Sequence, residues 1–248
     1  MLLAVDTSTK YAGVALYSVP TSETGRVIAS RCWYSSVNHT SELMPAVSQM
    51  LESQRVALAD LTGIALALGP GGFSALRVGM STVKGLAFIL GIPVVGVGTL
   101  DLEAHPYARA KVPVCSILDA GRNEVASARF GGNGQRIRDD TVSTVPELLE
   151  ELANLSTPST GSHQTENSRT LLCGEGVINW GDFIRERMNS RAMVIEPSPA
   201  TRLSSLCQLG WHKLGQGEVS DLVSLQPLYL RMPSIGGPKR RDQVPQSS

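Results

Sequence analysis

The chain has 248 residues, and its 22 Lys and Arg balance 22 Asp and Glu, so the formal net charge is zero. That length allows one large domain or two small lobes around a substantial core. A protein dedicated to nucleic acid usually carries a basic excess, so the balance argues against that class. A subunit whose partners hold the nucleic acid is still allowed.

The cysteines form no CxxC pair and the histidines are scattered, so the sequence predicts no metal site. The N-terminus lacks the basic region of a signal peptide, and no uncharged stretch reaches the ~20 residues of a membrane-spanning helix. We therefore predict a cytoplasmic protein without membrane contact.

The first hundred residues predict an antiparallel meander followed by two helices. Strands are expected at residues 2–5, 11–18, 27–35, 64–68 and 94–97. Ser41 is a good N-cap for a helix that ends near Ser53, because apolar side chains recur at three- and four-residue steps after it. The second helix is expected over residues 74–90.

The pattern of the first strands returns later in the chain. A strand at 114–118 ends at Asp119, and a polar turn leads to a second strand at 124–130, just as the first strand ends at Asp6 before a polar turn. This repeat indicates an internal duplication. We assign residues 1–106 to an N-terminal lobe and 107–233 to a C-terminal lobe.

The C-terminal lobe also contains predicted helices and polar segments. Helices are expected at 145–155 and 201–214. Residues 156–169 are rich in Ser, Thr, Gly and Asn and predict a surface loop. Residues 234–248 have almost nothing to bury and predict a disordered tail.

The most specific motif is the string GPGGFSALRVG at residues 69–79. An apolar strand leads into it and an apolar helix leads out. A glycine turn before a helix points backbone N–H groups at an anion, and the helix dipole favours negative charge there. The chain therefore binds a phosphate at this turn or descends from a fold that does.

Familiar catalytic motifs do not fit this string. No GxxxxGK[ST] occurs, GxGxxG fails at Ser74, and GxSxG lacks its last glycine. Asp6 and Asp119 remain as carboxylates at strand ends, where they could hold a metal–phosphate group across a cleft. Alternatively, each is an Asx-turn residue that caps its own loop.

Several motifs together resemble the TsaB family. Five motifs stand in the order found in that family: DTST at 6–9, His39 with its helix, the glycine string, Asp119-Ala120 with Glu124-Val125, and PLYLR at 227–231. The resemblance covers about residues 1–232. It implies a two-lobed, actin-like and sugar-kinase-like ATPase fold, with duplicated ribonuclease H-like lobes of mixed sheets flanked by helices.

The resemblance implies a non-catalytic dimerisation subunit required for N6-threonylcarbamoyladenosine (t6A37) formation in tRNA. The family usually reads GPGSFTGLR, DAR and EVY, and this chain departs from those strings at Gly72, Ser74, Ala75, Gly121 and Ala126. The catalytic relative, TsaD, carries an HxxxH metal motif where this chain has Thr99 and Glu103. The resemblance therefore implies a scaffold without catalytic or metal residues, an inactive homologue of the peptidases for which the wider group was once named.

The resemblance also places a nucleotide near the glycine turn. No intrinsic cofactor is expected, but ATP or ADP with Mg²⁺ could sit at a subunit interface. The residues expected near such a nucleotide are Asp6, Thr7, Ser8, Gly69, Gly71, Gly72, Arg77, Asp119 and Glu124.

The expected partner is a TsaD-type catalytic subunit, paired through the helices at 41–53 and 74–90. A TsaE-type ATPase and tRNA would be reached through the complex, and the chain alone could form a homodimer. Excess apolar surface on the two helices supports a partner site. The interface predicted from them comprises Leu43, Val47, Met50, Leu51, Leu76, Met80, Val83 and Phe88. These residues could equally belong to the core.

Two enzymatic alternatives are open. One is an actin-like-fold small-molecule kinase or ATPase that uses Asp6 and Asp119 around Mg²⁺-ATP. The other is a peptidase, which needs a metal or nucleophile constellation that the sequence does not contain.

Overall fold

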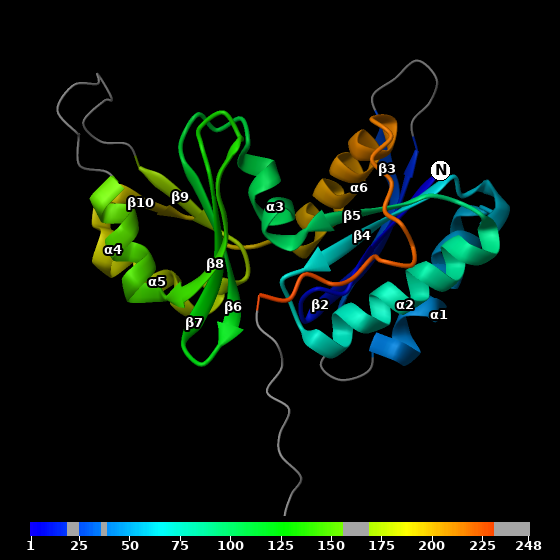
Figure 1. Ribbon diagram of the computed structural model, residues 1–248, viewed down its shortest axis with the longest axis horizontal. Helices are drawn as coiled ribbons and strands as arrows, with labels where there is room; N and C mark the ends of the chain where they lie inside the picture. Colours follow the sequence, from blue (N-terminus) through cyan, green and yellow to red (C-terminus); the bar gives the residue numbers. More distant parts are fainter. Residues whose placement is uncertain (19–24, 36–38, 156–168, 231–248) are drawn as a thin grey trace, which may run out of the picture.

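The structure is a computed structural model that describes residues 1–18, 25–35, 39–155 and 169–230. Two five-stranded sheets stand side by side with helices on their faces (Figure 1). The strand order is β3-β2-β1-β4-β5 in one and β10-β9-β6-β7-β8 in the other, so the chain follows the same path twice. This repeat confirms the predicted fold. The tail at 234–248 and all but one residue of the loop at 156–169 lie outside the described residues.

The first sheet has a hydrophobic core on each face, and its edge strand β3 is largely exposed. Its strands are β1 (Leu2–Asp6), β2 (Tyr11–Ser18), β3 (Arg26–Tyr34), β4 (Gly63–Gly69) and β5 (Val94–Gly98). The first three are antiparallel, and β4 and β5 extend the sheet in parallel with β1. Along β1, Leu3 and Val5 face a core shared with α1 (His39–Gln54) and α2 (Phe73–Leu90). Leu2 and Ala4 face a second core on the opposite side.

The second sheet repeats this plan. Its strands are β6 (Val114–Gly121), β7 (Glu124–Phe130), β8 (Arg136–Thr144), β9 (Thr170–Cys173) and β10 (Ala192–Val194). The first three are antiparallel, and β9 and β10 run parallel to β6. Helices α4 (Val145–Leu155) and α5 (Gly176–Met188) cover one face, in the same chain positions as α1 and α2.

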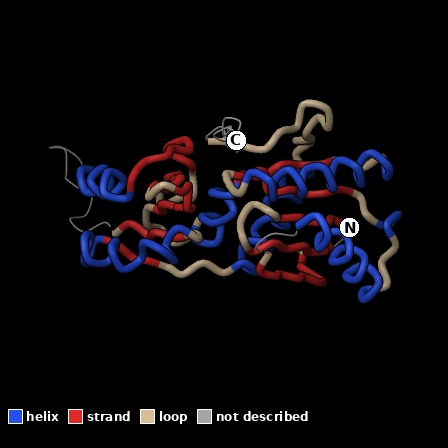
Figure 2. Tube along the Cα trace, turned by 90° about the horizontal axis from the view of Figure 1, so that it is seen from below, coloured by secondary structure: helices blue, strands red, loops and turns tan. Residues whose placement is uncertain are grey.

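The third helix of each repeat packs against the sheet of the other. Helix α6 (Pro199–Gly215) follows β10, yet its Leu203 and Leu206 pack on the first sheet. Helix α3 (Thr99–Ala104) follows β5, yet its Leu100 packs in the core of the second. Figure 1 shows α6 on one side of the first lobe's strands and α1 and α2 on the other, and Figure 2 shows helices and strands in both lobes from below. Leu102 of α3 packs in the first lobe's core, so α3 lies against both sheets. Packing therefore differs from the sequence division at residue 106, because α6 completes the first lobe and α3 is shared between the two.

Some boundaries and short elements differ from the sequence prediction. Helix α1 begins at His39, so Ser41 lies in its first turn and is not the N-cap. The sequence did not predict α3, α5, β8, β9 and β10, nor the 3-10 turns at Leu58–Asp60, His105–Tyr107 and Asn189–Arg191. Most of these are too short or too polar for periodicity to reveal.

After α6 the chain returns across the first lobe as an extended segment, residues 218–230, which we call the C-terminal strap (orange in Figure 1). The amide of Ser220 donates to the carbonyl of Val94 at 2.8 Å, and that of Leu228 donates to Leu68 at 2.8 Å. Leu222 packs against the first lobe's core and Leu230 against the second lobe's core. The strap therefore contacts both lobes.

Candidate functional site

The glycine turn between β4 and α2 packs directly on the β1–β2 turn. A Cβ at Gly71 would lie 2.0 Å from the carbonyl oxygen of Ser8, and a Cβ at Gly79 would lie 2.3 Å from Thr7 Oγ1. The Gly72 amide donates to the Ser8 carbonyl at 3.0 Å, and Thr7 Oγ1 donates to the Ala75 carbonyl at 2.8 Å. Gly71 and Gly79 are thus required by close packing, because a side chain at either position would overlap the β1–β2 turn. The Gly72 amide, which was expected to bind a phosphate, is already hydrogen-bonded to Ser8.

This packing predicts different results for two adjacent glycines. Gly71→Ala should lower the free energy of unfolding by about 1–3 kcal/mol, because its Cβ meets a backbone carbonyl that cannot rotate away. Gly72→Ala is the matched control, since its Cβ would meet only Ala75 Cβ, at 3.7 Å. Urea denaturation of both variants measures the difference. Equal losses would contradict the role assigned to this contact.

The carboxylate of Asp6 lies in a buried ionic cluster rather than in an open cleft. Arg202, from the first turn of α6, donates from Nε to Asp6 Oδ2 at 2.5 Å. Ser8 donates to Asp6 Oδ1 from its amide at 2.8 Å and from its hydroxyl at 2.6 Å. Only 1% of the Asp6 side chain is exposed. Both carboxylate oxygens are therefore engaged within the protein.

Two further carboxylates meet the same guanidinium. Arg202 Nη1 donates to Glu103 of α3 at 3.0 Å and to Glu175 at 2.7 Å. Nη2 donates to Thr9 Oγ1 at 2.8 Å and to the Tyr11 carbonyl at 2.9 Å. All five guanidinium N–H groups thus have an acceptor. We call Asp6, Glu103, Glu175 and Arg202 the Arg202 cluster.

Burial shapes the ionisation of this cluster. Desolvation raises the pKa of Glu103, and the nearby charges of Glu175 and Asp6 raise it further, while Arg202 acts to lower it. For Arg202, burial acts to lower the pKa, but the three carboxylates outweigh it and raise the value above normal. The guanidinium is therefore charged at every relevant pH, and Glu103 is the carboxyl that most readily holds a proton.

The raised pKa of Glu103 predicts a pH-dependent gain for Glu103→Gln. Below the ordinary value of 4.5 the carboxyl is protonated in the folded and unfolded chain, so the variant should match the wild type. Above pH 4.5 Glu103 loses its proton in the unfolded chain but keeps it in the folded chain. The free energy of unfolding of the wild type therefore falls as the pH rises, until the pH exceeds the pKa of Glu103 in the folded chain. The variant lacks this loss. Urea unfolding at about pH 4, 6 and 8 should show a difference that grows in the variant's favour; a deficit independent of pH would contradict this account.

Asp119 and Glu124, the second-lobe candidates, lie elsewhere. Asp119 Oδ1 accepts from the Gly121 amide at 2.7 Å, as in an Asx turn, and Oδ2 accepts from Asn179 Nδ2 at 3.0 Å. Glu124 begins β7 and pairs in register with Gly121 and Thr144. Asp119 is exposed, whereas Asp6 is buried. The matching sequence contexts of the two aspartates therefore lead to different environments.

One cavity brings the glycine turn and Asp119 together. It has a volume of about 390 Å³ and lies between the glycine turn, the β6–β7 hairpin and the C-terminal strap. Its lining residues are Pro70, Gly71, Gly72, Phe73, Leu118, Asp119, Ala120, Arg122, Ala126, Val142, Leu228, Tyr229 and Leu230. Of the predicted nucleotide residues it includes Gly71, Gly72 and Asp119, but not Asp6, Thr7, Ser8, Gly69, Arg77 or Glu124.

Arg77 holds the strap beside this cavity. Its guanidinium carbon lies 3.9 Å from the centre of the Phe73 ring, and Nε donates to the Tyr229 hydroxyl at 3.2 Å. The Phe73 and Tyr229 rings are 4.9 Å apart. Arg77 therefore anchors the C-terminal strap to α2.

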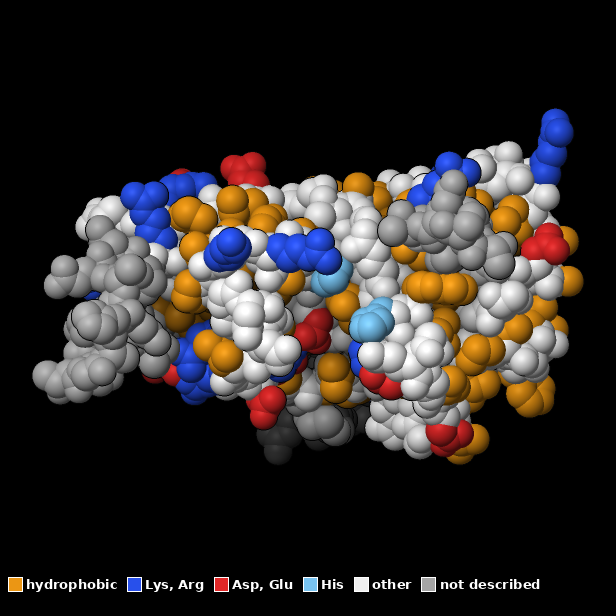
Figure 3. All heavy atoms as spheres, turned by 90° about the horizontal axis from the view of Figure 1, so that it is seen from above, with side chains coloured by type: hydrophobic (Ala, Val, Ile, Leu, Met, Phe, Trp, Pro, Cys, Tyr) orange, Lys and Arg blue, Asp and Glu red, His pale blue; other side chains and the backbone are white. Residues whose placement is uncertain are grey.

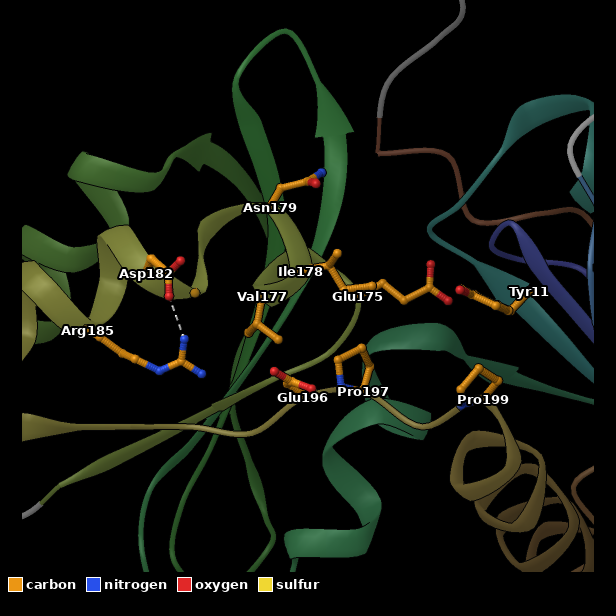
Figure 4. Close-up of a pocket in the computed structure, with 11 residues that line it drawn as sticks. Tyr11, Glu175, Val177, Ile178, Asn179, Asp182, Arg185, Glu196, Pro197 and Pro199 are labelled. Atoms are coloured by element: carbon orange, nitrogen blue, oxygen red, sulfur yellow. Dashed lines mark hydrogen bonds and ion pairs between the residues drawn. The ribbon is translucent and has the colours of Figure 1, made fainter.

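A second cavity of about 410 Å³ lies at the start of α5, the counterpart of α2 in the second lobe (Figure 4). Glu175 and Tyr11 point toward one another across it, and Asp182 pairs with Arg185 at 2.8 Å. Its mixed, largely paired charges favour no particular ligand. Across the described ranges, no group of three His, Cys, Asp or Glu side chains is arranged to hold a metal.

The predicted partner interface is wrong for seven of its eight residues. Leu43, Val47, Met50, Leu51, Leu76, Met80 and Val83 are all at most 6% exposed and lie within the chain itself. The physical reason is that the apolar positions of α1 and α2 cover their own sheet. Phe88, by contrast, is 82% exposed, and its neighbour Ile89 is 80% exposed.

Helix α2 is also the one helix of the described chain that is long and apolar enough, by length and composition, to cross a membrane. Its inner face packs on the first sheet, as the core helix of a globular protein would. Figure 3 shows acidic, basic and apolar side chains interspersed on the face seen from above, without a field of one sign.

Comparison with known proteins assigns the family. A family model described as "TsaD: tRNA N6-adenosine threonylcarbamoyltransferase" matches residues 34–177. The Bacillus subtilis "tRNA threonylcarbamoyladenosine biosynthesis protein TsaB" is 30% identical over 235 residues, which cover 93% of this chain and 94% of that protein. The chain belongs to the TsaB family. The Escherichia coli TsaB protein is 26% identical with the same coverage.

The solved structure "YeaZ from Pseudomonas aeruginosa" is 29% identical to this TsaB-family chain, with a TM-score of 0.66 over 92% of this chain and 99% of that one. Proteins named tRNA N6-adenosine threonylcarbamoyltransferase match less fully. The match to the Desulfitobacterium hafniense protein is 33% identical, but it covers only 48% of this chain and 36% of that protein.

Of the Arg202 cluster, sequence reasoning singled out only Asp6 and missed Glu103, Glu175 and Arg202. Arg202 carried a detectable signal, because it lies four residues before Leu206 on the buried stripe of α6. A charged residue on an apolar stripe indicates a buried partner. Glu175 stands between two glycines directly after the buried strand β9, in a strand–turn–helix context like that of the glycine turn.

Proposed function

We propose that this chain is a non-catalytic subunit in the biosynthesis of threonylcarbamoyladenosine in tRNA, where it supports a TsaD-type catalytic subunit. The observation that carries the proposal is the state of Asp6. A nucleotide-processing site of this fold would need that carboxylate for a metal–phosphate group, whereas here Arg202 and Ser8 engage both of its oxygens. Full-length similarity to proteins named TsaB supports the pathway.

The partner would bind the outer faces of α1 and α2. Phe88 and Ile89 expose most of their apolar surface, and Met44 on α1 is 38% exposed. Large exposed apolar side chains on neighbouring helices are typical of a protein–protein interface. A TsaE-type ATPase and tRNA would join through the catalytic subunit, in the cytoplasm, and the same face would support a homodimer when the partner is absent.

A nucleotide, if the complex holds one, would lie in the cavity between the glycine turn and Asp119, next to the subunit interface. Phe73 and Tyr229 offer aromatic surface there, and Arg122 offers positive charge. In this proposal Asp6 makes no direct contact with the nucleotide or with Mg²⁺. A kinase or ATPase of its own would require that contact, so we do not favour the enzymatic alternative.

Reconstitution tests the proposal. Purified TsaD-type partner, TsaE-type ATPase, threonylcarbamoyl donor and unmodified tRNA are combined with and without the chain, and modified adenosine is measured by mass spectrometry. We expect modification to depend on the chain and to survive Asp119→Asn. Unchanged modification without the chain would overturn the proposal, and phosphotransfer by the chain alone, abolished by Asp119→Asn, would favour the kinase.

A further inference from the structure

The C-terminal strap carries a highly exposed apolar side chain that the fold does not use. Among the described residues, the large apolar side chains with the highest exposed fractions are Val223, Phe88 and Ile89, at 89%, 82% and 80%. Val223 belongs to the strap, and the other two belong to the last turn of α2. Exposed apolar residues that stand alone are normal, whereas a contiguous group is typical of an interaction site. The position of the strap relative to α2 therefore decides what Val223 does.

The strap runs beside α2 (Figure 1 and Figure 2). Arg77, Lys84 and Phe88 are separated by seven and four residues, so they project from one side of that helix. Arg77 donates to the Tyr229 hydroxyl near the end of the strap. Hydrogen bonds within the strap lower the pKa of Asp221, near its start, and the nearby positive charge of Lys84 lowers this pKa further. Phe88 is one helical turn beyond Lys84 and therefore lies on the side of α2 that the strap follows.

A preformed turn presents Val223 at this place. The Asp221 carboxylate accepts from the amides of Val223 at 3.3 Å and Ser224 at 3.0 Å. It also accepts from the Ser224 hydroxyl at 2.7 Å. Leu222 and Leu225, on either side of the tip, pack against the first lobe's core. A partner would not have to order this turn, and ordering is one of the costs of binding.

We propose that the Val223 turn, residues 221–224, extends the partner surface at Phe88 and Ile89 and binds the TsaD-type catalytic subunit through Val223. The inference rests on the proposed function, because it adds the strap to the face that α1 and α2 offer to that subunit. Apolar side chains that two neighbouring elements hold in fixed positions are suited to the central, water-excluded part of a protein–protein interface.

The family match favours the catalytic subunit over a second copy of this chain. The TsaD model matches residues 34–177, so α1 and α2 lie inside the segment that the two kinds of subunit share. Helices common to both subunits do not by themselves favour a mixed pair over two like chains, because specificity is a difference between two affinities. The strap lies outside the match, so the Val223 turn supplies a contact that distinguishes the two pairings.

Val223→Ser tests the proposal, with Ile178→Gln as the matched control. Serine removes the apolar area and suits a turn. We expect Val223→Ser to weaken binding of the purified TsaD-type subunit by about tenfold or more, measured by isothermal titration calorimetry. Ile178 is 60% exposed on α5 of the second lobe, so Ile178→Gln should bind like the wild type. Both variants should keep the wild-type melting temperature, because the replaced side chains are exposed.

The outcomes separate this inference from the proposed function. If Val223→Ser binds like the wild type while the variant with Phe88 and Ile89 changed to Gln does not bind, the proposed function stands and the inference is wrong. If the wild-type chain does not bind the TsaD-type subunit and modification of tRNA does not depend on it, both are wrong. Light scattering of the chain alone tests the choice of partner. Loss of self-association in Val223→Ser, with unchanged binding of the TsaD-type subunit, would overturn the inference in favour of a second copy.

Discussion

Replacing Arg202 with Met should lower the free energy of unfolding by about 3–5 kcal/mol, which is among the largest losses expected from a single substitution. Methionine has a similar length and fills most of the space, so a cavity contributes little. The loss arises because three largely buried carboxylates, 1%, 6% and 14% exposed, lose the guanidinium that pairs with all of them. Urea denaturation of the full chain at neutral pH measures it.

Arg185→Met is the matched control for this substitution. Arg185 pairs with Asp182 at 2.8 Å on α5, but the two side chains are 49% and 102% exposed. An exposed pair of this kind contributes at most about 1 kcal/mol. Equal losses at the two positions would show that burial of the cluster does not matter to stability.

A second comparison isolates the electrostatic part of the loss. Glu103→Gln removes one of the stranded charges, so its combination with Arg202→Met should cost less than the sum of the two single changes, because the groups share one network. Additive losses would mean that Arg202 acts through packing alone.

The strand pattern made much of this fold predictable. Apolar strands ending at Asp6 and Asp119, each before a polar turn, indicated a duplication, and the two sheets follow the same order. The exchange of α3 and α6 was not predictable, because an amphipathic helix such as α6 shows that it has an apolar face but not which sheet it covers. Leu203 and Leu206 would suit either sheet.

The candidate site was less predictable, for two reasons. Its central ion pairs join Asp6, Glu103, Glu175 and Arg202 across most of the chain length, and no local pattern encodes which charges meet. The equivalence of Asp6 and Asp119 also held only at the level of strand ends. Asp6 pairs with Arg202 of α6 and is buried, whereas Asp119 caps its own hairpin and is exposed.

The prediction of which residues of α1 and α2 face a partner failed for a related reason. A helix that covers its own sheet and a helix that binds a partner both show apolar residues at three- and four-residue spacing. Leu43, Val47 and Leu76 fit the pattern and are core residues. What distinguishes a partner surface is apolar area left over outside that stripe, which only the structure shows at Phe88 and Ile89.

Changing Phe88 and Ile89 together to Gln should therefore abolish assembly while leaving the fold intact. Each side chain would contribute about 1.5–3 kcal/mol if buried by a partner, so losing both should weaken binding at least about 100-fold. The folded chain loses little, because the two residues are 82% and 80% exposed and Gln is a good helix former. Light scattering with the TsaD-type partner and the tRNA modification assay measure assembly and activity.

Ile137→Gln combined with Ile178→Gln is the matched control. These side chains are 63% and 60% exposed, and they lie on β8 and α5 of the second lobe, away from α2. The control variant should bind and support modification like the wild type, since removing exposed apolar area affects assembly only where the partner covers it. If both double variants assemble normally, the partner does not bind this end of α2; if both fail, the loss does not report a specific surface. Failure of the α2 variant alone would identify the exposed end of α2 as the surface that holds the catalytic subunit.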